Sequence, residues 1–188
     1  MKKLLILIAL VAIGGHLWAQ DRVINMPEAP EKGYNVAEVD NGFWFSFDIG
    51  GGYTVMEGRD NVGMVGASGV GGYRFNEYLK VGAGLGILYY PNGTKVRSTK
   101  NHIGMPLFIN ARGNFLSGLT RQTVPYWSIN LGTTIPDGFF LTPSLGLRIG
   151  EKRGAFLVNA GYTIRHLKTE PGHKSGYSGV LLKVGYEF

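Results

Sequence analysis

Apolar and polar residues alternate with a period of two along most of the chain after residue 41. The last segment shows the pattern most clearly, because Lys183 and Glu187 fall on the face opposite the apolar side chains and only Leu181 breaks the alternation. The apolar face consists of Val180, Leu182, Val184, Tyr186 and Phe188. Period two is the side-chain period of a β-strand whose faces meet different surroundings. The segment therefore predicts a strand with one apolar and one polar face.

Seven earlier segments repeat this alternation. Each approaches the ~9–11 residues that a tilted strand needs to cross a bilayer. Glycine obscures the phase of the second segment, and Phe108 in the fourth stands on the polar face. The segments are 43–50, about 63–75, 79–89, 105–114, 127–135, 141–149 and 156–165. Together with the last segment they predict eight strands.

The faces differ in a way that favours a membrane. A soluble β-sandwich is the alternative, but it needs polar outer faces, whereas here the consistently apolar face carries the large residues. The other face carries Gly, Asn, Ser and Arg, as expected when lipid lies outside and polar groups lie inside. We predict an all-β fold, an eight-stranded antiparallel up-and-down transmembrane β-barrel over residues 42–188. Ten strands are the alternative if residues 116–123 contribute further pairing.

Connection lengths and aromatic positions agree with this topology. Short turns at 76–77 and 151–154 alternate with longer segments at 55–62, 91–102 and 168–176, and long loops are usual on the extracellular side. Residues 116–123 and 136–137 break the rule. Aromatic residues prefer the headgroup level, and they gather near strand ends in two predicted girdles. One girdle holds Phe43, Phe45, Tyr73, Phe75, Phe115, Trp127, Phe156, Tyr186 and Phe188, and the other holds Tyr53, Tyr89, Phe139 and Tyr177.

The first residues predict export. Lys2 and Lys3 precede an apolar run at 4–13, and Ala19 offers a cleavage point before Gln20. This is the pattern of a secretory signal peptide over residues 1–19. A membrane anchor is the alternative, but the run is shorter than the ~20 residues of a spanning helix.

Composition excludes several kinds of chemistry. The chain has no cysteine, so disulfides, a lipidated N-terminal cysteine and thiolate zinc sites are excluded, and we expect no metal site and no cofactor. Without Lys2 and Lys3 the 19 basic residues become 17 against 13 acidic ones, a formal charge of +4. That excess is too mild to indicate a nucleic-acid partner.

Four motifs resemble the small outer-membrane β-barrel domain proteins of Gram-negative bacteria. They are residues 72–78 (GYRFNEY), 125–127 (PYW), 137–140 (DGFF) and 184–188 (VGYEF). The resemblance covers about residues 42–188. It implies a small barrel in the cell outer membrane. It also implies that Val184, Tyr186 and Phe188 form the C-terminal signal read by the barrel-assembly machinery, which would be a partner during insertion.

Charged residues on the polar face are the main candidate site. An eight-stranded lumen is filled by side chains and holds little water, so charges inside it must be paired. We predict an internal salt-bridge network that plugs the barrel. Its members are Asp48, Arg74, Lys80, Arg112, Arg148, Lys183 and Glu187.

The five cations of this set exceed its two acids, which suggests a second source of negative charge. Residues 20–41 are acidic, contain two prolines and show no strand pattern. One hypothesis is that this periplasmic segment caps the basic mouth of the barrel. The alternative is a disordered tether, which polar terminal segments commonly form.

The predicted outer loops are basic and suit the phosphates of lipopolysaccharide. The candidate contacts are Lys95, Arg97, Lys100, Lys168 and Lys174. His173 and Ser175 resemble the pair of lipid A deacylase barrels, but catalysis requires hydrogen-bond reach and an orienting acid. We therefore expect a non-enzymatic barrel with a structural, lipopolysaccharide-binding or protein-interaction role, which could include docking onto a larger outer-membrane complex. A narrow passive pore and a lipid A-modifying enzyme are the alternatives.

Overall fold

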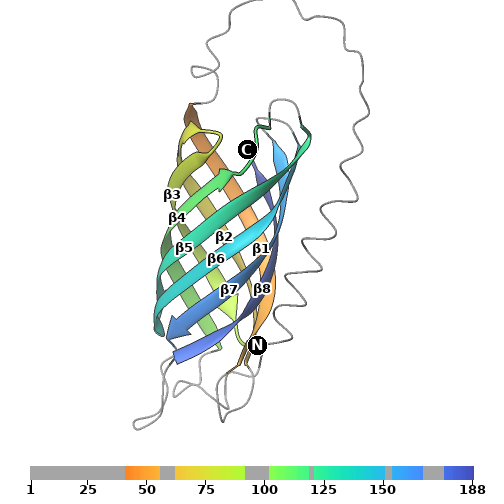
Figure 1. Cartoon of the computed structure of the whole chain (residues 1–188). Helices are drawn as coiled ribbons and strands as arrows, with labels where there is room; N and C mark the ends of the chain where they lie inside the picture. Colours follow the sequence, from red (N-terminus) through yellow and green to blue (C-terminus); the bar gives the residue numbers. More distant parts are fainter. Residues whose placement is uncertain (1–40, 56–61, 92–101, 119–120, 151–153, 167–175) are drawn as a thin grey trace, which may run out of the picture. The chain divides into compact units, whose positions relative to one another are not determined.

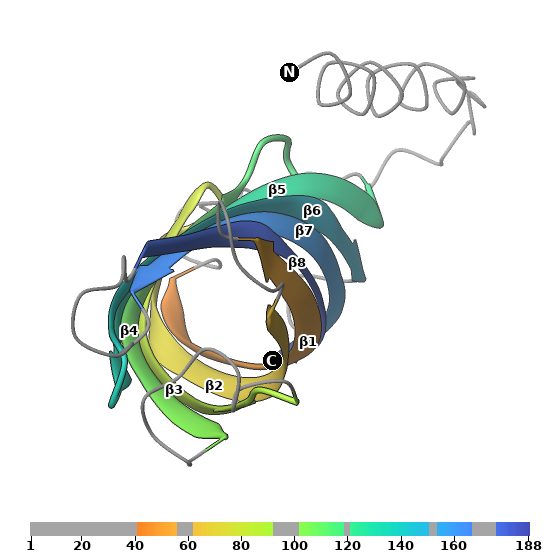
Figure 2. The same cartoon turned by 90° about the horizontal axis from the view of Figure 1, so that it is seen from below.

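A computed structural model describes residues 41–55, 62–91, 102–118, 121–150, 154–166 and 176–188. Within them eight strands form one closed barrel in which each strand pairs with its neighbours in the sequence and β8 pairs with β1, always antiparallel (Figures 1 and 2). The strands are β1 (Gly42–Val55), β2 (Val62–Asn76), β3 (Leu79–Tyr89), β4 (Ile103–Asn114), β5 (Thr123–Ile135), β6 (Gly138–Gly150), β7 (Ala155–His166) and β8 (Gly176–Glu187). No part of the described chain forms a helix long and apolar enough to cross a membrane.

The predicted eight-stranded, antiparallel up-and-down topology is confirmed. Strand lengths range from 11 to 15 residues, which exceeds the ~9–11 residues needed to cross a bilayer at a tilt. The ten-strand alternative is wrong. Ring closure leaves no free strand edge, and the described residues between β4 and β5 add no strand.

Burial alternates along the strands with the polar side inward. In β4 the pattern runs exposed, buried, exposed, buried over its first eight residues. In β8 the relative exposure is 67% for Leu182 and 7% for its neighbour Leu181. Most large apolar side chains therefore cover the outer wall. That arrangement is stable in hydrocarbon, where a barrel that closes on itself has no open sheet edge.

The two ends of the barrel differ. We call the end where β1 begins and β8 ends the terminal end, and the other the opposite end; the chain's C-terminus marks the terminal end in Figure 1. The β2–β3 turn at the terminal end is short because the Asn76 Oδ1 accepts hydrogen bonds from the backbone N–H of Tyr78 (2.9 Å) and Leu79 (2.8 Å). The backbone N–H of Phe188 donates to the carbonyl of Phe45 at 2.8 Å, which extends the β8–β1 closure by one bond.

Inward glycines make room for larger lumen residues. A Cβ atom on Gly84 would lie 2.5 Å from the Phe108 ring on the facing strand β4, so the absence of a side chain lets that ring enter the lumen. Such a contact is too short for any real side chain, and overpacking of this kind is destabilising.

Two aromatic positions show how phase decides location. Tyr177, predicted in an outer girdle, is instead 2% exposed and lies inside the barrel, so that prediction was wrong. It shares its phase with Leu181 and Lys183, and on a strand residues an even number apart share a face. Phe108 and Leu181, which break the sequence pattern, likewise point inward and fill the lumen.

Candidate functional site

The lumen near the terminal end is organised around one carboxylate, that of Glu187. Four cations from four strands approach it, and all five side chains are at most 8% exposed. Arg74 Nη2 lies 3.2 Å and Arg148 Nε 3.5 Å from its Oε1, and the Lys80 ammonium also contacts Oε1. Arg112 Nη1 lies 3.8 Å from Oε2.

Strand register explains why these cations need a common acid. Arg74 pairs across the β2–β3 ladder with Lys80, and Lys80 pairs across the β3–β4 ladder with Arg112. Like charges directly opposite one another destabilise a sheet. Glu187 reaches all three from the last position of β8 and offsets that repulsion.

Arg112 joins this group to the middle of the lumen. Its Nη2 lies 3.5 Å from Asp48 Oδ2, and its guanidinium carbon lies 4.6 Å from the centre of the Trp44 ring. Its Nε donates to Asn110 Oδ1 at 2.6 Å. A planar guanidinium can serve an acid, an aromatic face and an amide at once, which an ammonium cannot.

The middle of the lumen is filled by neutral polar side chains. The Asn110 amide donates to Asn130 Oδ1 (2.5 Å) and Ser128 Oγ (2.9 Å). The Asn159 amide donates to the Tyr126 hydroxyl at 2.6 Å. Buried amides and hydroxyls that find partners in this way fix the side chains that fill an interior.

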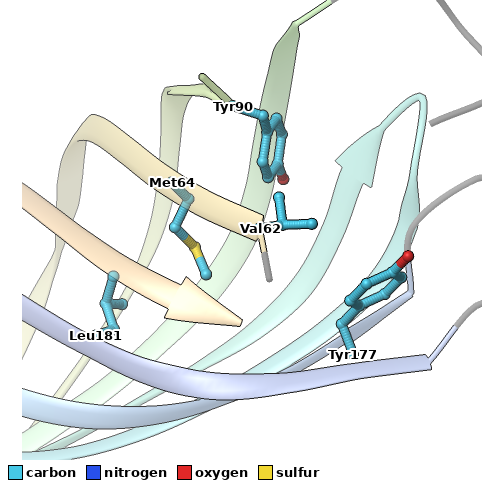
Figure 3. Packing of buried hydrophobic residues seen from close by; sticks show 5 residues of the cluster. All are labelled: Val62, Met64, Tyr90, Tyr177 and Leu181. Carbon is cyan, nitrogen blue, oxygen red and sulfur yellow. The ribbon is translucent and has the colours of Figure 1, made fainter. Parts of the chain in front are cut away.

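Toward the opposite end the lumen contains a cluster of apolar side chains beside buried polar ones, which include Thr54, Thr163 and Arg165. Five residues form this cluster: four belong to β2 and β8, and Tyr90 directly follows β3. Figure 3 shows their side chains gathered in the interior. They are Val62, Met64, Tyr90, Tyr177 and Leu181, each at most 7% exposed. A second buried group, formed by Trp44, Val70, Phe108 and Phe140, also packs inside the barrel.

A small cavity of about 50 Å³ lies within the lumen, with both polar and apolar lining residues. Asp48 and Lys183 contribute charge, Met64 and Leu181 come from the apolar cluster, and Arg165 adds a further cation. Such a volume exceeds the ~10–15 Å³ that one water-sized particle requires.

The structure thus brings six of the seven predicted network residues into one set of ion pairs. Lys183 points into the same lumen, but within the described residues its ammonium makes no ion pair. Arg165 was missed as a site residue, although it has the strand phase of Asn159 and Thr163, which also point inward. Its side chain is 4% exposed.

The other predicted residues lie elsewhere. Val184 and Phe188 are exposed on the outer wall, and the Tyr186 ring packs edge-on against Phe156 (5.0 Å) and Phe188 (4.8 Å). The five basic loop candidates and the pair His173 and Ser175 lie outside the described residues.

These features define a class: an eight-stranded transmembrane β-barrel with an apolar outer wall and a filled, charged interior. No protein-family model matches the sequence, and no curated protein matches it. The chain is similar to the crystal structure of Neisserial surface protein A, with a TM-score of 0.55 and 14% identity, covering 78% of this chain and 97% of that one. This likeness confirms the fold of the small outer-membrane barrels.

Two structures from Pseudomonas aeruginosa give lower scores. The N-terminal β-barrel domain of OprF has a TM-score of 0.41 at 16% identity, covering 76% of this chain and 97% of that one. The outer membrane protein OprG has a TM-score of 0.41 at 12% identity, covering 78% and 96%.

Proposed function

We propose that the chain is exported, loses residues 1–19 and resides in the outer membrane as a non-enzymatic structural barrel whose basic loops bind lipopolysaccharide. The observation that carries the structural part is the filled lumen. Four cations converge on Glu187 at the terminal end, and an apolar cluster occupies the lumen toward the opposite end.

A filled interior favours a structural role over transport. Eight strands enclose a lumen only wide enough for side chains, and a passive pore would need a continuous polar path through it. We expect the side chains that fill the lumen, from the ion pairs around Glu187 to the apolar cluster, to obstruct such a path. The interior therefore serves to hold the barrel together.

The lipopolysaccharide part rests on charge. Lys95, Arg97 and Lys100 belong to the segment that links β3 to β4, and Lys168 and Lys174 to the segment that links β7 to β8. Both segments leave the barrel at the opposite end, away from both termini of the barrel. Basic side chains at a membrane surface attract anionic headgroups, and each charge contributes about 1 kcal/mol to the free energy of binding.

Planar-bilayer recording tests the structural part. The refolded wild-type barrel should give no stepwise conductance. Regular conductance steps of a single size in the wild type would contradict the filled lumen and support the narrow pore instead.

Mass spectrometry of lipid A from wild-type and deletion strains tests the alternative of a lipid A-modifying enzyme. A non-enzymatic barrel leaves the lipid A species the same in both strains.

Lipopolysaccharide binding needs a separate measurement. We expect the triple variant Lys95→Gln, Arg97→Gln, Lys100→Gln in nanodiscs to bind lipopolysaccharide at least ~10-fold more weakly than the wild type, because three charge contacts are lost. Arg121→Gln, an exposed charge next to β5 at the terminal end, is the matched control and should bind like the wild type. Equal affinity of the triple variant and the wild type would remove this part of the proposal. A pull-down from detergent-solubilised outer membrane would show whether the barrel instead belongs to a larger complex.

A further inference from the structure

The lumen contains more positive than negative charge. Its described cations are the four around Glu187 together with Lys183 and Arg165, whereas the described acids inside are Glu187 and Asp48. Asp137 is also buried, but it belongs to the β5–β6 turn and does not line the cavity. Six cations against two acids leave an excess of four positive charges, and Lys183 and Arg165 are the two cations outside the ion pairs of Glu187 and Asp48.

Neither of these two cations has an acid of its own among the described residues. The Lys183 ammonium forms no hydrogen bond or ion pair there, and the acid that acts on it electrostatically, Asp48, is already paired with Arg112. Arg165 donates to the Tyr90 hydroxyl at 2.8 Å and to Thr163 Oγ1 at 3.5 Å. Its guanidinium carbon lies 5.3 Å from the centre of the Phe140 ring. These neutral contacts orient Arg165 without neutralising it.

Both cations line the same cavity, and neutral donors share that cavity. Ser68 carries a hydroxyl group, and the Asn130 Oδ1 is already engaged by Asn110, which leaves the Asn130 amide N–H groups to donate. Phe108 and Leu181 supply apolar wall. The carboxylate of Asp48 also lines the cavity, but its Oδ2 is paired with Arg112 at 3.5 Å. Two cations against this one acid, together with hydrogen-bond donors and a partly apolar wall, favour a desolvated anion, because buried charge must be compensated.

We propose that this cavity binds one small inorganic anion, of the size of chloride or bromide, between Lys183 and Arg165. The volume of about 50 Å³ suits a monatomic anion and is too small for a phosphorylated sugar or a lipid headgroup. The bound anion offsets one of the excess positive charges, beside the two cations that form no ion pair with Glu187 or Asp48. The site is independent of the lipopolysaccharide proposal, since it lies inside the barrel.

Anion-dependent stability tests the site. The thermal midpoint of the refolded protein in a zwitterionic detergent is measured in sodium chloride and in sodium gluconate at equal ionic strength. Gluconate is too large for the cavity, so the wild-type midpoint should be higher in chloride by at least about 3 °C, because a ligand that binds only the folded state stabilises it. Equal midpoints for the wild type would overturn the proposal.

The matched variants locate the effect. Lys183→Gln should lose the chloride-dependent shift, whereas the exposed Arg121→Gln should retain it in full. A shift that persists in Lys183→Gln would also overturn the proposal, because it would arise elsewhere. If Lys183→Gln does not fold, anomalous diffraction from crystals of the wild type grown in sodium bromide tests the site instead. A bromide peak between Lys183 and Arg165 supports the proposal, and a cavity without a peak refutes it.

Discussion

The two halves of the lumen are built from the same inward-facing strand positions but are held together differently. Near the terminal end four cations from β2, β3, β4 and β6 depend on Glu187. Toward the opposite end Val62, Met64, Tyr90, Tyr177 and Leu181 pack against one another, and the buried cation among them, Arg165, has neutral partners such as the Tyr90 hydroxyl. In the first half all four cations share Glu187, so a substitution of Glu187 should destabilise all four. In the second half each side chain makes its own apolar contacts, so a single substitution should affect only those contacts. The polar alternation of a barrel strand therefore fixes which residues enter the lumen but not how they are stabilised there.

Removal of the shared acid should have the largest effect. Glu187→Gln leaves four buried cations without their common partner, and breaking a buried ion pair costs about 3–5 kcal/mol in the free energy of unfolding. Urea-induced unfolding in lipid vesicles, followed by tryptophan fluorescence, measures the loss. Glu77→Gln is the control, because Glu77 lies in the β2–β3 turn, where it accepts a hydrogen bond from the Gly118 N–H. Comparable losses for the two variants would show that the four cations do not depend on Glu187.

A single truncation in the apolar half should cost less. Leu181→Ala removes a side chain that is 7% exposed, and such truncations cost about 2–4 kcal/mol. Leu181→Met keeps the volume and should cost less than about 1.5 kcal/mol in the same assay. If both variants unfolded like the wild type, the apolar cluster would not contribute to stability.

The contact between Gly84 and Phe108 tests whether the lumen is packed between the two halves. Gly84→Ala places a Cβ against the Phe108 ring, and overpacking costs about 1–3 kcal/mol. In a Phe108→Ala background the same change should cost clearly less, because the obstructing ring is gone, and a double-mutant cycle measures that coupling. Additive effects would mean that the ring does not occupy this position.

A neutral hydrogen bond in the polar half should matter least. Tyr126→Phe removes the acceptor of the Asn159 amide, a loss of about 1 kcal/mol for a buried bond. Tyr162→Phe, at a hydroxyl on the exposed outer wall, is the control and should unfold like the wild type. A larger loss for Tyr162→Phe than for Tyr126→Phe would contradict the assignment of inner and outer faces.

Strand phase was sufficient to predict the barrel, because lipid and lumen impose opposite demands on alternate residues. It was also sufficient to place Glu187, Arg74 and Lys80 inside. Phase alone could not predict which charges form ion pairs, since that depends on register. Lys183 faces Gly50 of β1 and Asn159 of β7, and neither residue carries a negative charge.

The apolar half was harder to predict. Leu181 and Phe108 break the alternation in the sequence. They were treated as exceptions because apolar residues were expected only on the face that contacts lipid. Tyr177 was assigned to a girdle from its place near a strand end, although its phase already placed it with Leu181. Apolar filling of a narrow lumen leaves no periodic signal of its own, so it became visible only in three dimensions.

The claim on which everything else depends is that lipid contacts the outer wall and not the inner face. Because the chain has no cysteine, single cysteines at positions 180 to 184 can each carry a nitroxide label without background. In lipid vesicles the labels at Val180, Leu182 and Val184 should collide freely with oxygen and little with a water-soluble nickel complex. The labels at Leu181 and Lys183 should show low oxygen access. Collision with the nickel complex at Val180, Leu182 and Val184, equal to that of an aqueous label, would contradict the account.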